Sequence, residues 1–417
     1  MSSSPAAATH SPSIPDQGVA WIAPGTRAYY QTNLALFLAG VANFSLLYCT
    51  QPLLPLLSAH FHIGVAESSL AVSVTTGVLA FAVMAAGAFS ESVGRRGLIF
   101  WSLAAAALLT LCAAFAPSWH LLLAARAVEG VALGGVSAVA MAYLAEEIDP
   151  RGLGTAMGLY VSASAIGGMG GRVLVSVIAD HSSWQVALAS ISVIGLLSAV
   201  GFFFLLPPSR HFVRREGLGL AHHLRLWGGH LRHPGLPLLF AMGFLGMGVF
   251  VTLYNYASFR LMEPQFGLSQ TQIGFIFTAY LCGMVSSSIA GAWSDRIGRA
   301  PVLVIGVLVT ALGVGLTCVD VLASVIGGIA VVTVGFFMVH TVCSAWIGRL
   351  GGAAKAYASS LYLLSYYLGS SVLGSFGGWF LDRGGWNAVV GFALASLAVA
   401  LVISLRLGLL TRRGTLS

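Results

Sequence analysis

GAFSESVGRR (residues 87–96) returns as GAWSDRIGR (residues 291–299), at an offset of 204 positions. A second pair of patches, ADHSSW (179–184) and LDRGGW (381–386), repeats at an offset of 202. Each patch is a short polar interruption between long apolar stretches. Two pairs at nearly one offset indicate that a unit of several hydrophobic segments has been duplicated. The sequence therefore predicts a membrane protein built from two similar halves.

The composition is that of a chain that spans a membrane many times. The 417 residues are 57% hydrophobic and only 8% charged. Apolar stretches of about 20 residues, each long enough to cross a bilayer as a helix, recur along the whole length. The alternating pattern of a membrane β-barrel is absent. We expect an all-α membrane protein with twelve transmembrane helices in two pseudo-symmetric six-helix bundles.

The apolar stretches can be divided into twelve spans and five regions. The regions are a cytoplasmic tail (1–28), an N-terminal bundle (29–206), a cytoplasmic linker (207–234), a C-terminal bundle (235–405) and a second cytoplasmic tail (406–417). Only Asp320 separates the ninth span from the tenth. The spans are expected near Thr32–Leu57, Ser68–Ser90, Gly97–Ala116, His120–Leu144, Gly154–Ala179, Trp184–Leu206, Gly235–Phe259, Gln270–Ser294, Pro301–Val319, Val321–Ile347, Ala356–Leu381 and Trp386–Leu405.

The basic residues are distributed unevenly between the two expected sides of the membrane. With the N-terminus inside, only Arg260 and Arg383 fall outside, and Arg126 and Arg172 fall within spans. The rest of the 20 Lys and Arg residues lie in cytoplasmic loops and tails, as the positive-inside rule requires. We expect a multi-pass protein of the cell inner (plasma) membrane with both termini cytoplasmic. This asymmetry accounts for the net charge of +7, so no nucleic-acid partner is expected.

The expected linker is basic and rich in histidine. Its leucines and Trp227 could let part of it lie on the inner membrane face, and a plain solvated linker is the alternative. The five cysteines lie singly in apolar segments without metal-ligand spacing. We expect no bound metal and no cofactor.

These patterns resemble the major facilitator superfamily over nearly the full length of the chain. The duplicated loop is similar to that superfamily's Gly-x-x-x-Asp/Glu-x-x-Gly-Arg signature, and RAVEG (126–130) is similar to Arg-x-x-Gln-Gly, with Glu replacing Gln. YCTQPLLP (48–55) and GGMGGR (167–172) look like an arabinose-efflux-permease-like, drug-exporter-like branch. Classical drug/proton antiporters carry Gly-Pro where this chain has Ile166 and Gly167. The resemblance implies a usually monomeric transporter that rocks two bundles about a central site.

The duplicated loops are the expected conformational latch. Glu91 ends the second span, where it can meet Arg95 or the positive end of a neighbouring helix. The resemblance implies that this latch stabilises the outward-facing state, and the alternative is that the charges only fix topology. The latch residues are Gly87, Glu91, Gly94, Arg95, Arg96, Asp295 and Arg299.

Three charges lie inside spans, where a charge is costly and usually functional. Arg126 and Glu129 are three residues apart on one helix face, and Arg172 lies at a similar depth in the next span. A cluster of two guanidinium groups around one carboxylate is therefore expected. Three roles remain open for it: proton transfer through Glu129, attraction of an anionic substrate, or a buried structural salt bridge.

Polar and aromatic side chains deep in other spans are candidates to line a substrate cavity. Each has a plainer alternative, namely a bridge between helices, a satisfied interior histidine or ordinary aromatic packing. The candidates are Asn43, Gln51, Tyr254, Asn255, His340, Tyr362 and Tyr366.

The expected function is secondary active transport. The first choice is proton-coupled efflux (antiport) of a small polar or anionic organic compound, with the tyrosines suiting an aromatic one. The alternatives are proton-coupled uptake or uniport of a sugar or carboxylate, and a non-transporting membrane sensor. The chain has no Gly-x-x-x-x-Gly-Lys loop, so a proton gradient is the expected energy source. No arrangement of catalytic residues predicts an enzyme.

Overall fold

The computed structural model describes residues 21–210 and 220–415, with only the backbone of residues 87–93, 138 and 220. Within these ranges the regular structure is helical, apart from one bridge between Ile22 and Ile148. The Ile22 amide donates to Glu147, and its carbonyl accepts from Asp149. Residues around Ile22 are therefore attached to the junction of α6 (Trp119–Glu147) and α7 (Pro150–His181). Of the expected tail over residues 1–28, residues 1–20 lie outside the described part.

The N-terminal half supplies six membrane spans. The first is interrupted: α1 stops at Tyr48 and a 3-10 turn follows, because Pro52 has no N–H and its ring excludes a continuous helical ladder. The elements are α1 (Arg27–Tyr48), η1 (Gln51–Leu53), α2 (Leu54–Phe61), α3 (Val65–Ser68), α4 (Leu70–Val93), α5 (Arg95–Ala114), α6 (Trp119–Glu147), α7 (Pro150–His181) and α8 (Trp184–Leu205).

The C-terminal half follows a connecting helix, α9 (Leu220–Leu231). The last two spans of the C-terminal half form one continuous element that bends at Gly385. Glycine adopts the φ of 61° at this position without strain. The elements are α10 (Leu236–Met262), α11 (Gln270–Ile276), η2 (Phe277–Ala279), α12 (Tyr280–Ile297), α13 (Arg299–Leu316), α14 (Leu322–Leu350), η3 (Gly352–Ala354) and α15 (Lys355–Arg412).

The expected twelve-span, all-α membrane fold is confirmed. Within the described ranges, ten helical runs are long and apolar enough to cross a membrane. The longest run holds two spans divided at Gly385, and α4 supplies a further one through its apolar stretch Leu70–Ala86. The ninth and tenth spans are separated by residues 317–321, a wider break than the single Asp320 suggested.

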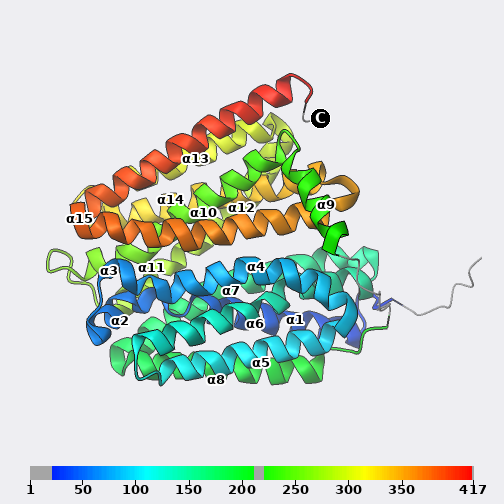
Figure 1. The fold of residues 1–417 in the computed structure, drawn as a ribbon, viewed down its shortest axis with the longest axis horizontal. Coiled ribbons are helices and arrows are strands. Elements are labelled where there is room, and N and C mark those ends of the chain that lie inside the picture. Colours follow the sequence, from blue (N-terminus) through cyan, green and yellow to red (C-terminus); the bar gives the residue numbers. More distant parts are fainter. Residues whose placement is uncertain (1–20, 211–219, 416–417) are drawn as a thin grey trace, which may run out of the picture.

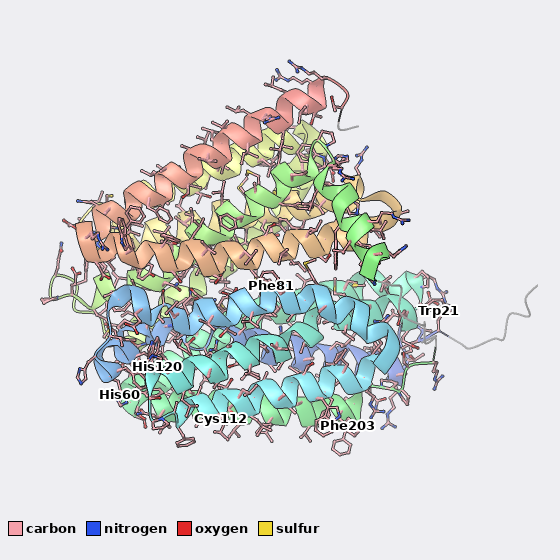
Figure 2. The ribbon with its side chains drawn as sticks, viewed as in Figure 1. Trp21, His60, Phe81, Cys112, His120 and Phe203 are labelled. Atoms are coloured by element: carbon pink, nitrogen blue, oxygen red, sulfur yellow. The ribbon has the colours of Figure 1, made fainter. Side chains whose placement is uncertain are left out.

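The two halves lie side by side with their helices running in similar directions (Figure 1). We call the end with α2, α3 and the Gly385 bend the outer end, following the predicted topology, and the opposite end the inner end. The C-terminus lies at the inner end (Figure 1), as does Trp21, whereas His60 and His120 lie at the outer end (Figure 2).

Contacts between the halves close the outer part of the molecule. α4 packs on α15, α7 on α11, and α3 on α15. A Cβ at Gly274 would lie 2.4 Å from that of Ser176, and one at Gly378 would lie 2.4 Å from Cα of Ala66, so glycine permits both close approaches. Hydrogen bonds across the interface include Gln51 to Asn255 (2.8 Å), Gln270 to Pro52 (2.7 Å), Thr271 to Asp180 (3.2 Å) and Ser371 to Ser73 (2.7 Å).

Candidate functional site

Arg126 and Glu129 form a fully buried ion pair on α6. Their spacing of three residues puts both side chains on one helix face, and Nη1 of Arg126 lies 2.6 Å from Oε2 of Glu129. Both side chains have no exposed surface. The second oxygen of Glu129, Oε1, has no hydrogen-bond partner within the ranges that the structure describes. The pair is thus a charge-assisted contact with one unused acceptor.

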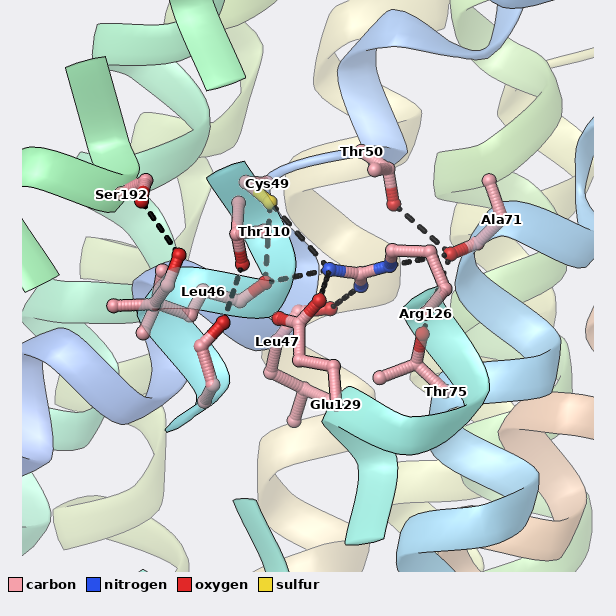
Figure 3. Close-up of polar contacts among 12 residues, drawn as sticks. Leu46, Leu47, Cys49, Thr50, Ala71, Thr75, Thr110, Arg126, Glu129 and Ser192 are labelled. Carbon is pink, nitrogen blue, oxygen red and sulfur yellow. Dashed lines mark hydrogen bonds and ion pairs between the residues drawn. The ribbon is translucent and has the colours of Figure 1, made fainter. Parts of the chain in front are cut away.

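Arg126 also holds the interrupted end of α1 (Figure 3). It donates to the carbonyls of Leu46 (3.2 Å) and Leu47 (2.7 Å), and to that of Ala71 on α4 (3.0 Å). Leu46 and Leu47 belong to the last turn of α1, whose carbonyls lack partners within the helix. Arg126 donates hydrogen bonds to these carbonyls and so fixes the end of α1. The position of η1, which begins with Gln51 at the interface, is fixed with it.

Arg172 on α7 lies in a separate network. Its Nε donates to Oε1 of Gln51 (2.7 Å), and its Nη1 donates to the carbonyl of Gly168 (2.5 Å). No carboxylate of the described residues forms an ion pair with it. The expected cluster of Arg126, Glu129 and Arg172 is therefore corrected to a buried pair and a second, unpaired guanidinium.

Aromatic rings from both halves surround the guanidinium of Arg172. Its Cζ lies 4.3 Å from the ring centre of Tyr48 on α1. It lies 5.2 Å from the ring centres of Phe277 and Tyr280, which belong to the C-terminal half. Cation–π contacts partly compensate the buried charge but supply no anion. Arg172, only 2% exposed, therefore lies at the junction of the halves with no counter-ion among the described residues.

Gln51 connects Arg172 to the C-terminal half. A guanidinium can only donate, so Oε1 of Gln51 must face Arg172 and Nε2 must face away. Nε2 donates to Oδ1 of Asn255 (2.8 Å), which turns Nδ2 of Asn255 away as a buried donor with no partner in the described part of the chain. Gln51 and Asn255 are separated by 204 residues, the offset of the duplicated loops. Equivalent positions of the two halves thus meet at their common interface.

The other cavity candidates fall into two groups. The first lies in the C-terminal half: His340 hydrogen-bonds to Tyr362 (2.8 Å), Tyr366 packs on His340 (ring centres 5.0 Å apart), and Tyr254 stacks on Phe277 (5.1 Å). Tyr254 also packs on Phe250, which stacks on Phe336 beside His340, so Tyr254 joins this group to the rings around Arg172. The second is Asn43 alone, which donates to Ser137 (3.1 Å) within the N-terminal half.

Two of the expected latch residues, Arg95 and Arg96, make polar contacts with described residues that lie outside the expected latch. Arg95 makes a two-pronged contact with Glu146 on α6, with distances of 3.0 and 2.5 Å, a partner that the sequence did not suggest. Arg96 donates to the carbonyl of Phe203 (2.5 Å). Gly94 and its repeat Gly298 share the same positive-φ geometry (95° and 91°), which explains glycine at both positions.

Among the described side chains, Asp295 and Arg299 form no ion pair. Asp295 is exposed and forms no ion pair with any described residue. Nε of Arg299 is buried and has no hydrogen-bond partner among the residues that the structure describes. Gly87 and Glu91 lie in the stretch whose side chains are outside the described residues, so the expected contact between Glu91 and Arg95 stays a prediction.

Comparison with known proteins decides the family. The model of the Major Facilitator Superfamily matches residues 36–263 and 255–415. The chain belongs to the major facilitator superfamily. It is 43% identical over 407 residues to the inner membrane transport protein YnfM of Escherichia coli (strain K12), covering 97% of this chain and 96% of that protein. It is 42% identical over 384 residues to the MFS-type transporter YybF of Bacillus subtilis (strain 168), covering 92% and 95%.

Solved structures support the same fold. A bacterial homolog of the human lysosomal transporter Spinster, in an inward-facing and occupied conformation, superposes with a TM-score of 0.77 over 93% of this chain and 97% of that one, at 13% identity. The expected membership of the major facilitator superfamily is thus confirmed. The chain is a multi-pass membrane transporter of this superfamily.

The rings around Arg172 are absent from the sequence-based list of cavity candidates. Tyr48 lies within the quoted YCTQPLLP stretch but was read there only as part of a branch signature. Phe277 belongs to the apolar run of the eighth span, and nothing in its spacing marks it. The 204-residue offset could have indicated the contact of Gln51 with Asn255, because equivalent positions near a pseudo-twofold axis lie close together.

Asn255→Leu should shift the protein toward an outward-open state. The substitution removes the acceptor of Gln51 and with it one hydrogen bond across the interface, so we expect about a fivefold rise in the open-to-closed ratio. Spin labels at the exposed positions His62 and Gln265, one on each half at the outer end, would report this change as a longer distance population. Asn43→Leu is the matched control, since it removes a buried amide bonded only within one half. An unchanged distance distribution in Asn255→Leu would count against the bridge.

Proposed function

We propose that this transporter exports a small organic anion in exchange for protons by alternating access. The observation that supports this proposal is the unpaired guanidinium of Arg172 at the junction of the halves. A buried charge without a counter-ion is costly, and an anionic group of the substrate would supply the missing partner. A guanidinium can bind carboxylate or phosphate through two parallel hydrogen bonds.

Binding at Arg172 would act on the interface through Gln51. A substrate carboxylate would compete with Oε1 of Gln51 for the same donor. Once displaced, Gln51 is no longer oriented toward Asn255, and the bridge between the halves is weakened. A ligand shifts a conformational equilibrium only through such a difference in contacts between states.

The rings around Arg172 favour a substrate with a flat apolar body. Tyr48, Phe277 and Tyr280 face the guanidinium from opposite halves, and Tyr254 extends this surface through Phe277. An aromatic acid would place its carboxylate on Arg172 and its ring among these side chains. An aromatic acid is therefore favoured over a sugar, whose hydroxyl groups would leave the charge unpaired.

Glu129 is the proposed proton carrier. Arginine stays charged in proteins, so Glu129 is the member of the buried pair that can bind and release a proton. Its Oε1 has no partner, and protonation would therefore break no hydrogen bond at that oxygen. The contacts of Arg126 with Leu46 and Leu47 support a second role, in which the pair is structural and keeps η1 in place.

Accumulation in inside-out membrane vesicles tests the proposed function. An exporter that exchanges an organic acid for protons should accumulate that acid when the vesicle interior is acidified, and an ionophore that collapses the pH gradient should abolish the accumulation. Gradient-driven loss of the compound from the vesicles would indicate uptake, and equilibration unaffected by the ionophore would indicate uniport. Binding without any flux would favour a sensor.

A further inference from the structure

The connecting helix α9 lies across the inner end of the molecule. It runs at a steep angle to α10 and α15, which cross the membrane (Figure 1). It links α8, a span that ends at Leu205, to α10, a span that begins at Leu236. Because the spans stand roughly along the membrane normal, the axis of α9 lies near the plane of the inner membrane surface.

One face of α9 is attached to the protein. Trp227 donates from Nε1 to the hydroxyl of Ser360 (3.2 Å), and His223 hydrogen-bonds to the hydroxyl of Tyr357 (3.0 Å). His230 contacts the carbonyl of Ala354 (3.1 Å). Spacings of four and three residues put these three side chains on one helix face. The attachment, to η3 and the start of α15, fixes α9 to the C-terminal half.

The rest of the surface of α9 divides into an apolar stripe and a basic stripe. Leu224 and Leu231 are seven residues apart on one face, 56% and 55% exposed. Arg225 is exposed and follows at about 100° around the helix, and Arg232, also exposed and seven residues further on, is the first residue after the end of α9. Around the axis the order is therefore the attached face, the apolar stripe and the basic stripe. A helix that lies beside a protein at a membrane surface needs this order, with its apolar stripe toward the acyl chains.

We propose that α9 is an interfacial helix that binds the anionic headgroups of phospholipids in the leaflet at the inner end. Leu224 and Leu231 enter the boundary of the acyl chains, and Arg225 and Arg232 contact the phosphates above them. Further cations surround the attachment point, since Arg349 and Lys355 are exposed just before and at the start of α15. Because the attached face joins α9 to the C-terminal half, lipid bound to α9 would stabilise the position of that half against the membrane.

Lipid binding by the full-length protein tests this inference independently of the substrate. Native mass spectrometry would compare the apparent affinity for phosphatidylglycerol with that for phosphatidylcholine. We expect Arg225→Gln/Arg232→Gln to lower the preference for phosphatidylglycerol at least threefold, and the corresponding double lysine variant to retain it. Arg151→Gln/Arg383→Gln is the matched control, because it removes two exposed charges that do not lie on α9.

The apolar stripe provides a second measurement. In nanodiscs of phosphatidylcholine containing phosphatidylglycerol, amide exchange in α9 should be slower than in phosphatidylcholine alone, and Leu224→Ser/Leu231→Ser should remove this protection. Soluble glycerol phosphate should not reproduce it, since a membrane lipid is the proposed ligand. An unchanged lipid preference in Arg225→Gln/Arg232→Gln, or equal exchange in both nanodiscs, would overturn the inference.

Discussion

Arg172→Gln should abolish transport of the organic anion and weaken its binding about 100-fold, the cost of removing one partner of a buried charge pair. The neutral amide is shorter, carries no charge and has no guanidinium fork. It would also remove the orienting bond to Gln51. Equilibrium binding of the compound identified in the vesicle assay, to purified protein, measures the loss.

Two further substitutions distinguish the contributions of charge, side-chain geometry and folding to the binding of the anion. Arg172→Lys keeps the charge but loses the planar fork, so an intermediate loss of about tenfold is expected. Arg151→Gln removes one charge from an exposed side chain in the first turn of α7 and should leave binding unchanged. Binding of the anion by Arg172→Gln with wild-type affinity would exclude Arg172 as the anion site.

Glu129→Gln should reduce gradient-driven transport to the level seen with an ionophore while exchange of substrate across the membrane continues. Glutamine has nearly the shape of glutamate, and its side-chain oxygen can still accept from Arg126, so the hold on α1 is kept. It cannot carry a proton at neutral pH, and the gradient is then uncoupled from the substrate. Paired measurements of driven accumulation and of counterflow in the same vesicles provide the comparison.

The structural role of the pair predicts a different pattern. If Arg126 and Glu129 only hold the end of α1, Glu129→Gln should lower driven transport, counterflow and thermal stability together. Glu147→Gln is the control, since Glu147 is also a buried carboxylate of α6 but lies at the helix end and binds Ser209. Full gradient-driven activity in Glu129→Gln would rule out the proposed proton carrier.

The fold could be predicted because it depends on the hydropathy of whole segments, to which every residue contributes. Hydropathy marks the spans, and the duplicated loops mark the halves. The interruption of α1 was missed although Pro52 and Pro55 are visible, because the apolar stretch continues through them. A hydropathy pattern reports burial in lipid, whereas the position of Gln51 depends on where the helical ladder stops.

The sequence identified individual residues of the site but did not predict which of them are in contact. Charges in apolar spans identified Arg126, Glu129 and Arg172, because each is costly there. Their pairing was not predictable, since similar depth does not say which neighbour a side chain faces. Arg172 faces Gln51 because of how α7 packs against α1 and α11, which no local pattern records. Similarly, Arg95 and Glu146 are 51 residues apart, and neither lies in a pattern that points to the other.

The most direct test of the account is substrate-induced proton movement in proteoliposomes that contain a trapped pH dye. The panel should hold sugars, aromatic acids and cationic drugs, each tested with the wild type, Arg172→Gln and Glu129→Gln. The account predicts a pH change with an organic acid, in the direction of antiport, that both substitutions abolish. A pH change with sugars or cationic drugs but with no acid, or one that persists in Arg172→Gln, would contradict it.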